Sequence, residues 1–231
     1  MQQLWPSHDP DPDLVALYTE PRTPWLRLNF VTSLDGAGTV EGRSEKLSGP
    51  ADKRAFGILR MLCDALLVGA GTLRDEGYRA LRLDDERRAW RAAHGKPEYP
   101  VLVVVSGRAD LDPAHPALAD APVRPIVITD SRADHLTGVA DIITPAGDLP
   151  GAVGKLRERG LRSILSEGGP HLFGSLTAAG LVDELCLTVS PLLAGPGAGR
   201  ITAGPPIPAP QELTLRHALL AEGQLILRYC R

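Results

Sequence analysis

The sequence has few cysteines, no long apolar run and no block of like charge, and each shortage excludes a class of protein. The 3 cysteines among 231 residues, Cys63, Cys186 and Cys230, are far apart in sequence. Disulfide frameworks and zinc sites need paired cysteines, so buried thiols in a reducing compartment are expected. The longest purely aliphatic run, Val101 to Val105, is too short to cross a bilayer.

The charge is nearly balanced, since 25 basic and 28 acidic residues give a formal net charge of −3. This balance argues against a nucleic-acid partner or a membrane surface. The first basic residue is Arg22, so the positive start of a secretory signal is missing and a cytoplasmic protein is expected. The hydrophobic content of 43% is typical of a globular chain.

Several short motifs that identify a chemistry are missing. The sequence contains no phosphate loop of the Gly-x-x-x-x-Gly-Lys type, no His-Glu-x-x-His and no Gly-x-Ser-x-Gly. The histidines do not pair at ligand spacing, so no metal site is expected. The segment Gly69-Ala70-Gly71 lacks the third glycine of the dinucleotide fingerprint, which excludes a standard Rossmann assignment.

Apolar patterns predict strands that alternate with helices. This order is typical of an α/β fold with a mainly parallel central sheet, helices on both faces and a C-terminal antiparallel hairpin. We expect residues 1–22 to form an N-terminal arm and residues 23–231 a single domain. The strands are predicted at 25–31, 65–68, 101–105, 126–129, 142–143, 163–166, 184–189, 212–219 and 224–229. Helices are predicted after Ser48-Gly49-Pro50, at 152–159 and at 170–180, and the charged residues 82–98 are expected to form a surface helix or loop.

Two glycine clusters follow apolar strands. They are Gly69-Ala70-Gly71-Thr72 and Gly168-Gly169-Pro170, and the second opens a predicted helix. Small residues allow backbone N–H groups to approach an anion, and a helix N-terminus adds partial positive charge. Together the clusters favour a phosphorylated cofactor, although each could also be a tight turn between a strand and a helix.

Two acidic residues at strand ends are candidates for the reaction. Asp35 could relay a proton or form an Asp-Gly turn, and Glu167 could accept hydrogen bonds from ring N–H groups or cap a helix. Asp183 and Glu184 are interpreted as boundary residues in contact with solvent or a helix end. Arg91 is assigned to a solvated helix face. Of the six histidines, His171 could face a phosphate and the other five are expected at the surface.

Five segments in this order resemble one known family. They are Ser33–Gly36, Asp64–Thr72, Ser166–Pro170, Leu181–Leu185 and Ser190–Gly195. Together they resemble the reductase domain of the riboflavin-pathway deaminase–reductases, whose fold is that of dihydrofolate reductase. The resemblance extends from about residue 24 to residue 229. It implies hydride transfer from NADPH to the sugar C1′ of a 5-amino-6-ribosylaminopyrimidine 5′-phosphate, by a stand-alone reductase that forms a homodimer through residues 181–195 and 212–229.

The resemblance also implies roles for individual residues. Ser44, Arg60 and Glu167 match substrate-binding positions, and Asp35 is the candidate for proton relay. Val31 is expected to flank the nicotinamide. The positions that match the cofactor site are Val31, Lys46, Gly71, Thr72, Glu76, Ser106, Gly168, Gly169, Pro170, His171, Leu172 and Phe173.

The sequence departs from the family pattern around the expected substrate pocket. Lys46 stands near the place of a frequent aromatic residue, and Glu76-Gly77-Tyr78 replaces the usual Asp-Asp-Pro. A reductase of a dihydrofolate- or pterin-like substrate and a catalytically idle NADP-binding protein therefore stay open as alternatives. Arg74, Arg108 and Lys46 are candidates for a basic group that selects NADPH over NADH.

Overall fold

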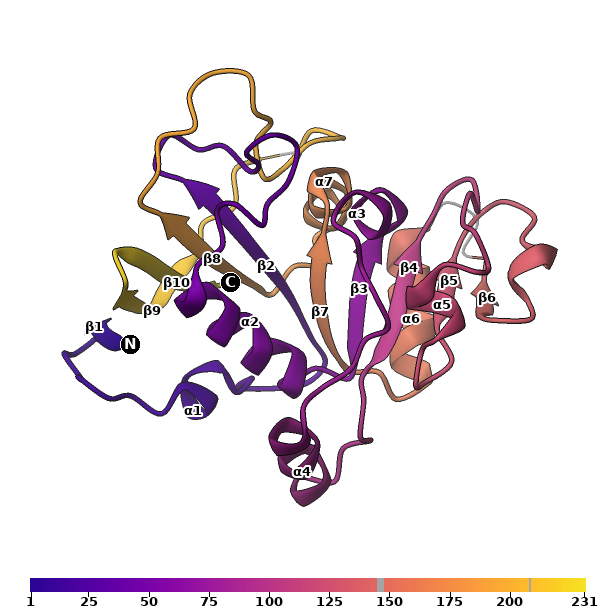
Figure 1. Ribbon diagram of the computed structural model, residues 1–231, viewed down its shortest axis with the longest axis horizontal. Helices are drawn as coiled ribbons and strands as arrows, with labels where there is room; N and C mark the ends of the chain where they lie inside the picture. The colour runs from indigo at the N-terminus through magenta and orange to yellow at the C-terminus, as the bar shows by residue number, and fades with distance from the viewer. Residues whose placement is uncertain (145–147, 208) are drawn as a thin grey trace.

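A single sheet organises the protein. The computed structural model describes residues 1–144, 148–207 and 209–231, and within them ten strands pair in the order β1-β9-β10-β8-β2-β7-β3-β4-β5-β6 (Figure 1). The pairs from β8 through β2 to β6 are parallel, and those among β8, β10, β9 and β1 are antiparallel. The strands are β1 (Gln2–Trp5), β2 (Trp25–Ser33), β3 (Ala65–Gly69), β4 (Val101–Val105), β5 (Ile126–Ile128), β6 (Asp141–Ile143), β7 (Ser163–Gly168), β8 (Glu184–Ser190), β9 (Thr214–Ala221) and β10 (Gln224–Cys230).

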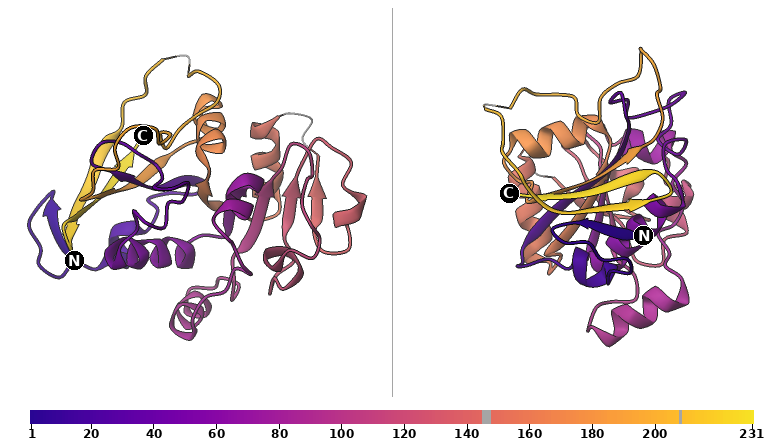
Figure 2. Two further views of the ribbon diagram at one scale, coloured as in Figure 1. Left: turned by 45° about the horizontal axis from the view of Figure 1, so that its top comes forward. Right: turned by 90° about the vertical axis from the view of Figure 1, so that its left-hand side faces the viewer.

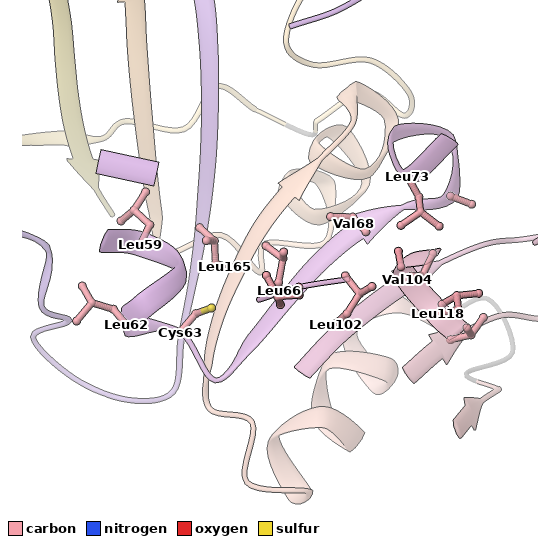
Figure 3. Close-up of a cluster of buried hydrophobic side chains, with 14 of the residues drawn as sticks. Leu59, Leu62, Cys63, Leu66, Val68, Leu73, Leu102, Val104, Leu118 and Leu165 are labelled. Carbon is pink, nitrogen blue, oxygen red and sulfur yellow. The ribbon is translucent and has the colours of Figure 1, made fainter. Parts of the chain in front are cut away.

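Helices cover both faces of this sheet, and the strand residues alternate between the two faces. In β3, Leu66 and Val68 pack in the cluster that contains Leu59 of α2 (Figure 3). Leu67 packs with Leu156 of α6 in the second cluster. A strand buried on both faces has apolar residues throughout, as β3 has. The helical elements are α1 (Leu14–Tyr18), α2 (Pro50–Leu62), α3 (Ala70–Asp75), α4 (Asp85–Ala93), α5 (Pro116–Ala119), η1 (Asp134–Leu136), α6 (Leu149–Glu158) and α7 (Pro170–Ala178).

The predicted fold class is therefore confirmed, down to the C-terminal hairpin of β9 and β10. Residues 1–22, expected to form an N-terminal arm, contain β1 and α1 although their sequence shows no helical or strand period. Strand β1 pairs with β9 at the edge of the sheet, beside the hairpin in Figure 2. At the start of α2 the N-cap is Gly49, and the Ser48 hydroxyl donates to the Asp52 carboxylate.

Glu184 corrects the interpretation of a boundary residue, because it is fully buried (0% exposed) at the start of β8. Its carboxylate accepts hydrogen bonds from Arg27 Nε at 2.5 Å, Arg228 Nη2 at 2.9 Å and Trp25 Nε1 at 2.8 Å. Arg27 also donates to the backbone oxygen of Tyr18 at 2.6 Å. The two arginines compensate the buried charge and attach the N-terminal segment to the sheet.

Two further surface expectations are wrong. Arg91 is fully buried, and its guanidinium donates hydrogen bonds to the backbone oxygens of Met61, Cys63 and Pro97. His217 is also buried, and burial lowers its pKa to about 4, so the ring is neutral at pH 7. The expected burial of the thiols is confirmed, since all three cysteines are buried and free. Among the described residues, no helix has the length and apolar character that crossing a membrane requires.

Candidate active site

The two glycine clusters meet at the carboxyl ends of adjacent strands. Strands β3 and β7 pair in parallel, with Val68 opposite Gly168, and Thr72 Oγ1 donates to the Gly168 oxygen at 2.9 Å. Gly169 has φ +92°, and a Cβ at this position would lie 2.5 Å from Thr72 Oγ1. Glycine is therefore required at 169 by both backbone conformation and space.

The first cavity, here called the glycine pocket, occupies about 620 Å³ beside the two glycine clusters, which form the bends after β3 and β7. Arg74 and Arg108 line it together with Gly69 and Ser175. Phe173 does not line it, because its ring is buried against Phe30 with the ring centroids 4.9 Å apart. The predicted cofactor residues that do line it are Gly71, Thr72, Ser106, Gly168, Gly169, Pro170, His171 and Leu172.

The second cavity, here called the polar pocket, adjoins the first and occupies about 890 Å³. Both cavities are lined by Thr72, Asp75, Gly169 and Pro170, so these residues form a shared rim. The predicted residues that line the polar pocket alone are Val31, Ser44, Arg60, Glu76 and Glu167. The structure thus brings most of the predicted cofactor and substrate positions to two connected cavities.

Glu167, at the end of β7, is held by three hydrogen bonds. Arg60 donates from Nε to Oε1 at 2.8 Å and from Nη2 to Oε2 at 2.6 Å, and Tyr78 donates its hydroxyl to Oε2 at 2.6 Å. The Arg60 guanidinium also lies 4.0 Å from the centroid of the Phe56 ring. Burial and the Glu167 charge raise the Tyr78 pKa well above its usual value, so the hydroxyl keeps its proton. Arg60 is therefore engaged by a carboxylate in this structure.

Two further residues of the polar pocket, Tyr78 and Asp52, are not among the predicted site residues, although Tyr78 belongs to the Glu76-Gly77-Tyr78 segment that departs from the family pattern. Tyr78 lies in the turn after α3, and Asp52 lies in the first turn of α2, where an acidic residue is common. Asp52 is nearly buried and accepts from Thr188 Oγ1 at 2.6 Å. Only pairings between distant segments bring these side chains into the pocket.

Asp35 and Lys46, like Phe173, line neither cavity. Asp35 accepts hydrogen bonds from the Ser33 hydroxyl and from the backbone N–H groups of Ala194 at 3.1 Å and Gly195 at 2.8 Å. The Ser33 hydrogen bond, followed by those two, lowers the Asp35 pKa to about 2. Its carboxylate is therefore ionised at neutral pH and ties two loops together, an arrangement that does not support a proton relay. Lys46 forms an exposed ion pair with Glu41.

Comparison with known proteins relates this geometry to a family of reductases. The family model of the RibD C-terminal domain matches residues 24–226. The 2,5-diamino-6-ribosylamino-4(3H)-pyrimidinone 5′-phosphate reductase of Methanothermobacter thermautotrophicus is 30% identical over 180 residues, which are 74% of this chain and 80% of that protein. The riboflavin biosynthesis protein RibD of Escherichia coli is 29% identical over 183 residues, 74% of this chain and 49% of RibD.

A solved structure agrees with these sequence matches. The crystal structure of a pyrimidine reductase-like protein from Corynebacterium diphtheriae superposes with a TM-score of 0.81 at 27% identity, covering 90% of this chain and 91% of that one. The fold of Saccharomyces cerevisiae riboflavin biosynthesis reductase Rib7 is also similar, with a TM-score of 0.63 at 17% identity over 93% of each chain. This chain thus covers most of the Methanothermobacter reductase and of the Corynebacterium protein, whereas it spans about half the length of RibD.

Proposed function

Because the chain belongs to the RibD C-terminal domain family, we propose that it is an NADPH-dependent reductase of riboflavin biosynthesis. Its substrate is a ribosylaminopyrimidine 5′-phosphate, which receives a hydride at the sugar C1′ and becomes the ribityl product. The observation that carries this proposal is the shared rim of Thr72, Asp75, Gly169 and Pro170. A cofactor in one cavity and a substrate in the other meet there.

The glycine pocket fits a phosphorylated dinucleotide. The bend at Gly169 brings backbone close to the cavity without a side chain, and α7 begins at the next residue, Pro170. Backbone N–H groups at a helix start attract phosphate. The exposed guanidinium of Arg108 and the Arg74 side chain supply the positive charge that a 2′-phosphate needs, whereas Lys46 lies outside the pocket. Bound NADPH would supply the hydride.

The polar pocket fits a phosphorylated pyrimidine. Its basic lining residues Lys53, Arg79, Arg82 and Arg200 offer positive charge to the 5′-phosphate. Glu167 offers a carboxylate to ring N–H groups, and Val31, near the end of β2, would flank the nicotinamide. The chain contributes chiefly orientation and charge complementarity, which suits hydride transfer without a protein nucleophile.

The reaction can be written with its bonds balanced. A hydride forms the new bond to C1′, the bond between C1′ and the ring oxygen breaks, and that oxygen takes up a proton. The pockets must hold C1′ at the shared rim while this occurs, since misplacement of reacting atoms is costly in rate.

A spectrophotometric assay tests the proposed function. Purified protein, NADPH and the ribosylaminopyrimidine phosphate are mixed, and the absorbance at 340 nm is followed. We expect absorbance loss together with a product two mass units heavier than the substrate. Absence of turnover with this substrate, but turnover of dihydrofolate, would replace the proposal with the pterin-like alternative. NADPH binding without turnover of any of these compounds would indicate an idle protein.

Substitution of Glu167 by glutamine is expected to impair turnover and leave cofactor binding unchanged. The variant loses the charge that Arg60 and a ring N–H group both need, and kcat/KM should fall by about tenfold or more. The NADPH dissociation constant should stay within about twofold, because Glu167 does not line the glycine pocket. The exposed Glu158→Gln on α6 serves as control. Equal losses in both quantities would show that Glu167 shapes the bend at 168 instead.

We also propose that the protein forms a homodimer. The support is a group of exposed leucines at the ends of β2 and β8, where Leu193 is 79%, Leu34 61% and Leu192 43% exposed. A second copy would remove this apolar surface from water. Sedimentation equilibrium tests the proposal, and a monomer mass at micromolar concentration would contradict it.

A further inference from the structure

Residues 76–78, which depart from the family pattern, form a built turn beside the polar pocket. Glu76 is the C-cap of α3, and its carboxylate accepts a hydrogen bond from the Ser44 backbone N–H at 2.9 Å. Gly77 has φ +66°, and the Tyr78 N–H donates to a backbone oxygen of α3 at 3.3 Å. This is a Schellman motif, in which glycine supplies the left-handed residue after the helix. The turn therefore fixes the backbone from which the Tyr78 side chain enters the pocket.

The Tyr78 side chain is held at both ends. It packs against the core cluster that contains Leu66, and its hydroxyl donates to Glu167 Oε2 at 2.6 Å. The Arg60 guanidinium, which binds both oxygens of the same carboxylate, lies 5.6 Å from the centroid of the Tyr78 ring and 4.0 Å from that of Phe56. Glu167 of β7 is therefore fixed from α2 and from the turn after α3, so its orientation is set before a ligand binds.

The hydroxyl of Tyr78 decides which oxygen of Glu167 is open to a ligand. Among donors of the described residues, Arg60 Nη2 and Tyr78 both bind Oε2, whereas Arg60 Nε alone binds Oε1. A carboxylate oxygen has about two acceptor positions, so Oε2 is fully occupied and Oε1 keeps one position. Without the hydroxyl, Oε2 would regain a position and a ligand N–H group would have a choice between two oxygens. The hydroxyl therefore reduces two binding modes to one.

We propose that Tyr78 is a positioning residue of this reductase. Its hydroxyl occupies Glu167 Oε2, so a ring N–H group of the substrate binds at Oε1 alone and the sugar C1′ is held in one place at the shared rim. The inference rests on the proposed function for the reaction, whereas the restriction of the ring to one mode is a property of binding. Because Tyr78 acts through Glu167, its contribution should disappear when that carboxylate is absent.

A double-mutant cycle tests this coupling with NADPH and the ribosylaminopyrimidine phosphate. Tyr78→Phe removes the hydroxyl and keeps the ring, and it is combined with Glu167→Ala. Tyr78→Phe should lower kcat/KM by about tenfold in the wild-type background and by less than about twofold in the Glu167→Ala background. The NADPH dissociation constant should stay within about twofold throughout, because neither residue lines the glycine pocket. Equal losses of kcat/KM in both backgrounds would show a packing role alone and overturn the inference.

Tyr78→Phe is informative by itself, without a variant of Glu167. The loss should fall chiefly on kcat, since the ring still binds Glu167 but C1′ is no longer held in one place. A loss confined to KM would show that the hydroxyl binds the substrate directly, and an unchanged kcat/KM would show that it does nothing. Either result overturns the inference. The matched control is Tyr99→Phe, which removes a hydroxyl outside both cavities and should keep the wild-type kcat and KM.

A measurement of binding separates this inference from the proposed reaction. The ribosylaminopyrimidine phosphate, labelled with ¹⁵N in its ring, is bound in the presence of NADP⁺, and its N–H resonances are recorded by NMR. The wild type and Tyr99→Phe should give one set of bound resonances, whereas Tyr78→Phe should give two sets or exchange-broadened ones. A single sharp set in Tyr78→Phe overturns the inference. The expected spectra from a protein that does not oxidise NADPH would reject the proposed reaction and leave the positioning role of Tyr78 in place.

Discussion

Substitution of Gly169 by valine is expected to lower the affinity for NADPH by about a hundredfold or more, equivalent to about 3 kcal/mol. Gly169 has φ +92°, a backbone conformation that a β-branched residue rarely adopts. A Cβ there would also lie 2.5 Å from Thr72 Oγ1, the atom that links the two glycine clusters. The added methyl groups would fill the space where phosphate approaches the backbone. Calorimetric titration with NADPH measures the effect.

A matched glycine variant controls for general effects of valine. Gly154 lies within α6, and a Cβ there has no neighbour within 4 Å, so Gly154→Val should bind NADPH as the wild type does. Gly169→Ala places the same Cβ beside Thr72 with less bulk and should give a smaller loss. Thermal melting of each variant establishes that it is folded. Wild-type NADPH affinity in a folded Gly169→Val protein would refute the role of this bend in phosphate binding.

Substitution of Glu184 by alanine is expected to destabilise the protein by about 3–5 kcal/mol. The change leaves Arg27 and Arg228 buried without their shared carboxylate, and it removes a partner of the Trp25 indole. For a chain of this length, the loss corresponds to a decrease in Tm of roughly 10 °C. Urea unfolding at pH 7 measures it. Asp141→Ala breaks an exposed pair with Arg124 and Arg159 and should cost about 1 kcal/mol or less.

The loss of stability caused by Glu184→Ala should also depend on pH. Burial raises the pKa of this carboxyl, but the charges and hydrogen bonds of Arg27 and Arg228 outweigh burial and lower the pKa to about 2. A carboxyl with a lowered pKa in the folded state stabilises fully above its unfolded pKa of about 4.5 and loses this contribution as the pH falls toward 2. The difference between wild type and Glu184→Ala should therefore shrink below about pH 4.5. A difference that is constant from pH 7 to pH 3 would contradict the assignment.

Local patterns in the sequence were sufficient to predict strands β2 to β10 and the two glycine bends, but not the edge strand β1. A short buried strand such as β3 is recognisable because its residues are apolar on both faces, and the glycines that follow it mark its end. Carboxyl ends of parallel strands lie at one edge of a sheet, so two bends that follow adjacent strands meet in space. The meeting of Thr72 with the bend at Gly168 and Gly169 could be anticipated for this reason.

Contacts between distant segments could not be anticipated. Glu184 is 157 residues from Arg27, and Asp52 is 136 residues from Thr188, so nothing near either acidic residue in sequence indicates burial. The sequence shows only an Asp at a helix start and a Glu at a strand start, which are usually solvated positions. For Asp35 the sequence left a proton relay and an Asp-Gly turn open, and the structure shows its carboxylate bound to the backbone N–H groups of Ala194 and Gly195.

Transfer of a label from the cofactor to the substrate tests the central claim, that the two cavities hold NADPH and a ribosylaminopyrimidine phosphate against their shared rim. NADPH deuterated at C4 of the nicotinamide, in each of the two stereoisomeric forms, is incubated with the protein and the substrate. The product is then analysed by mass spectrometry and proton NMR. The account predicts that one stereoisomer alone places a single deuterium at C1′ of the ribityl chain. NADPH oxidation with no deuterium in the product from either form would contradict it.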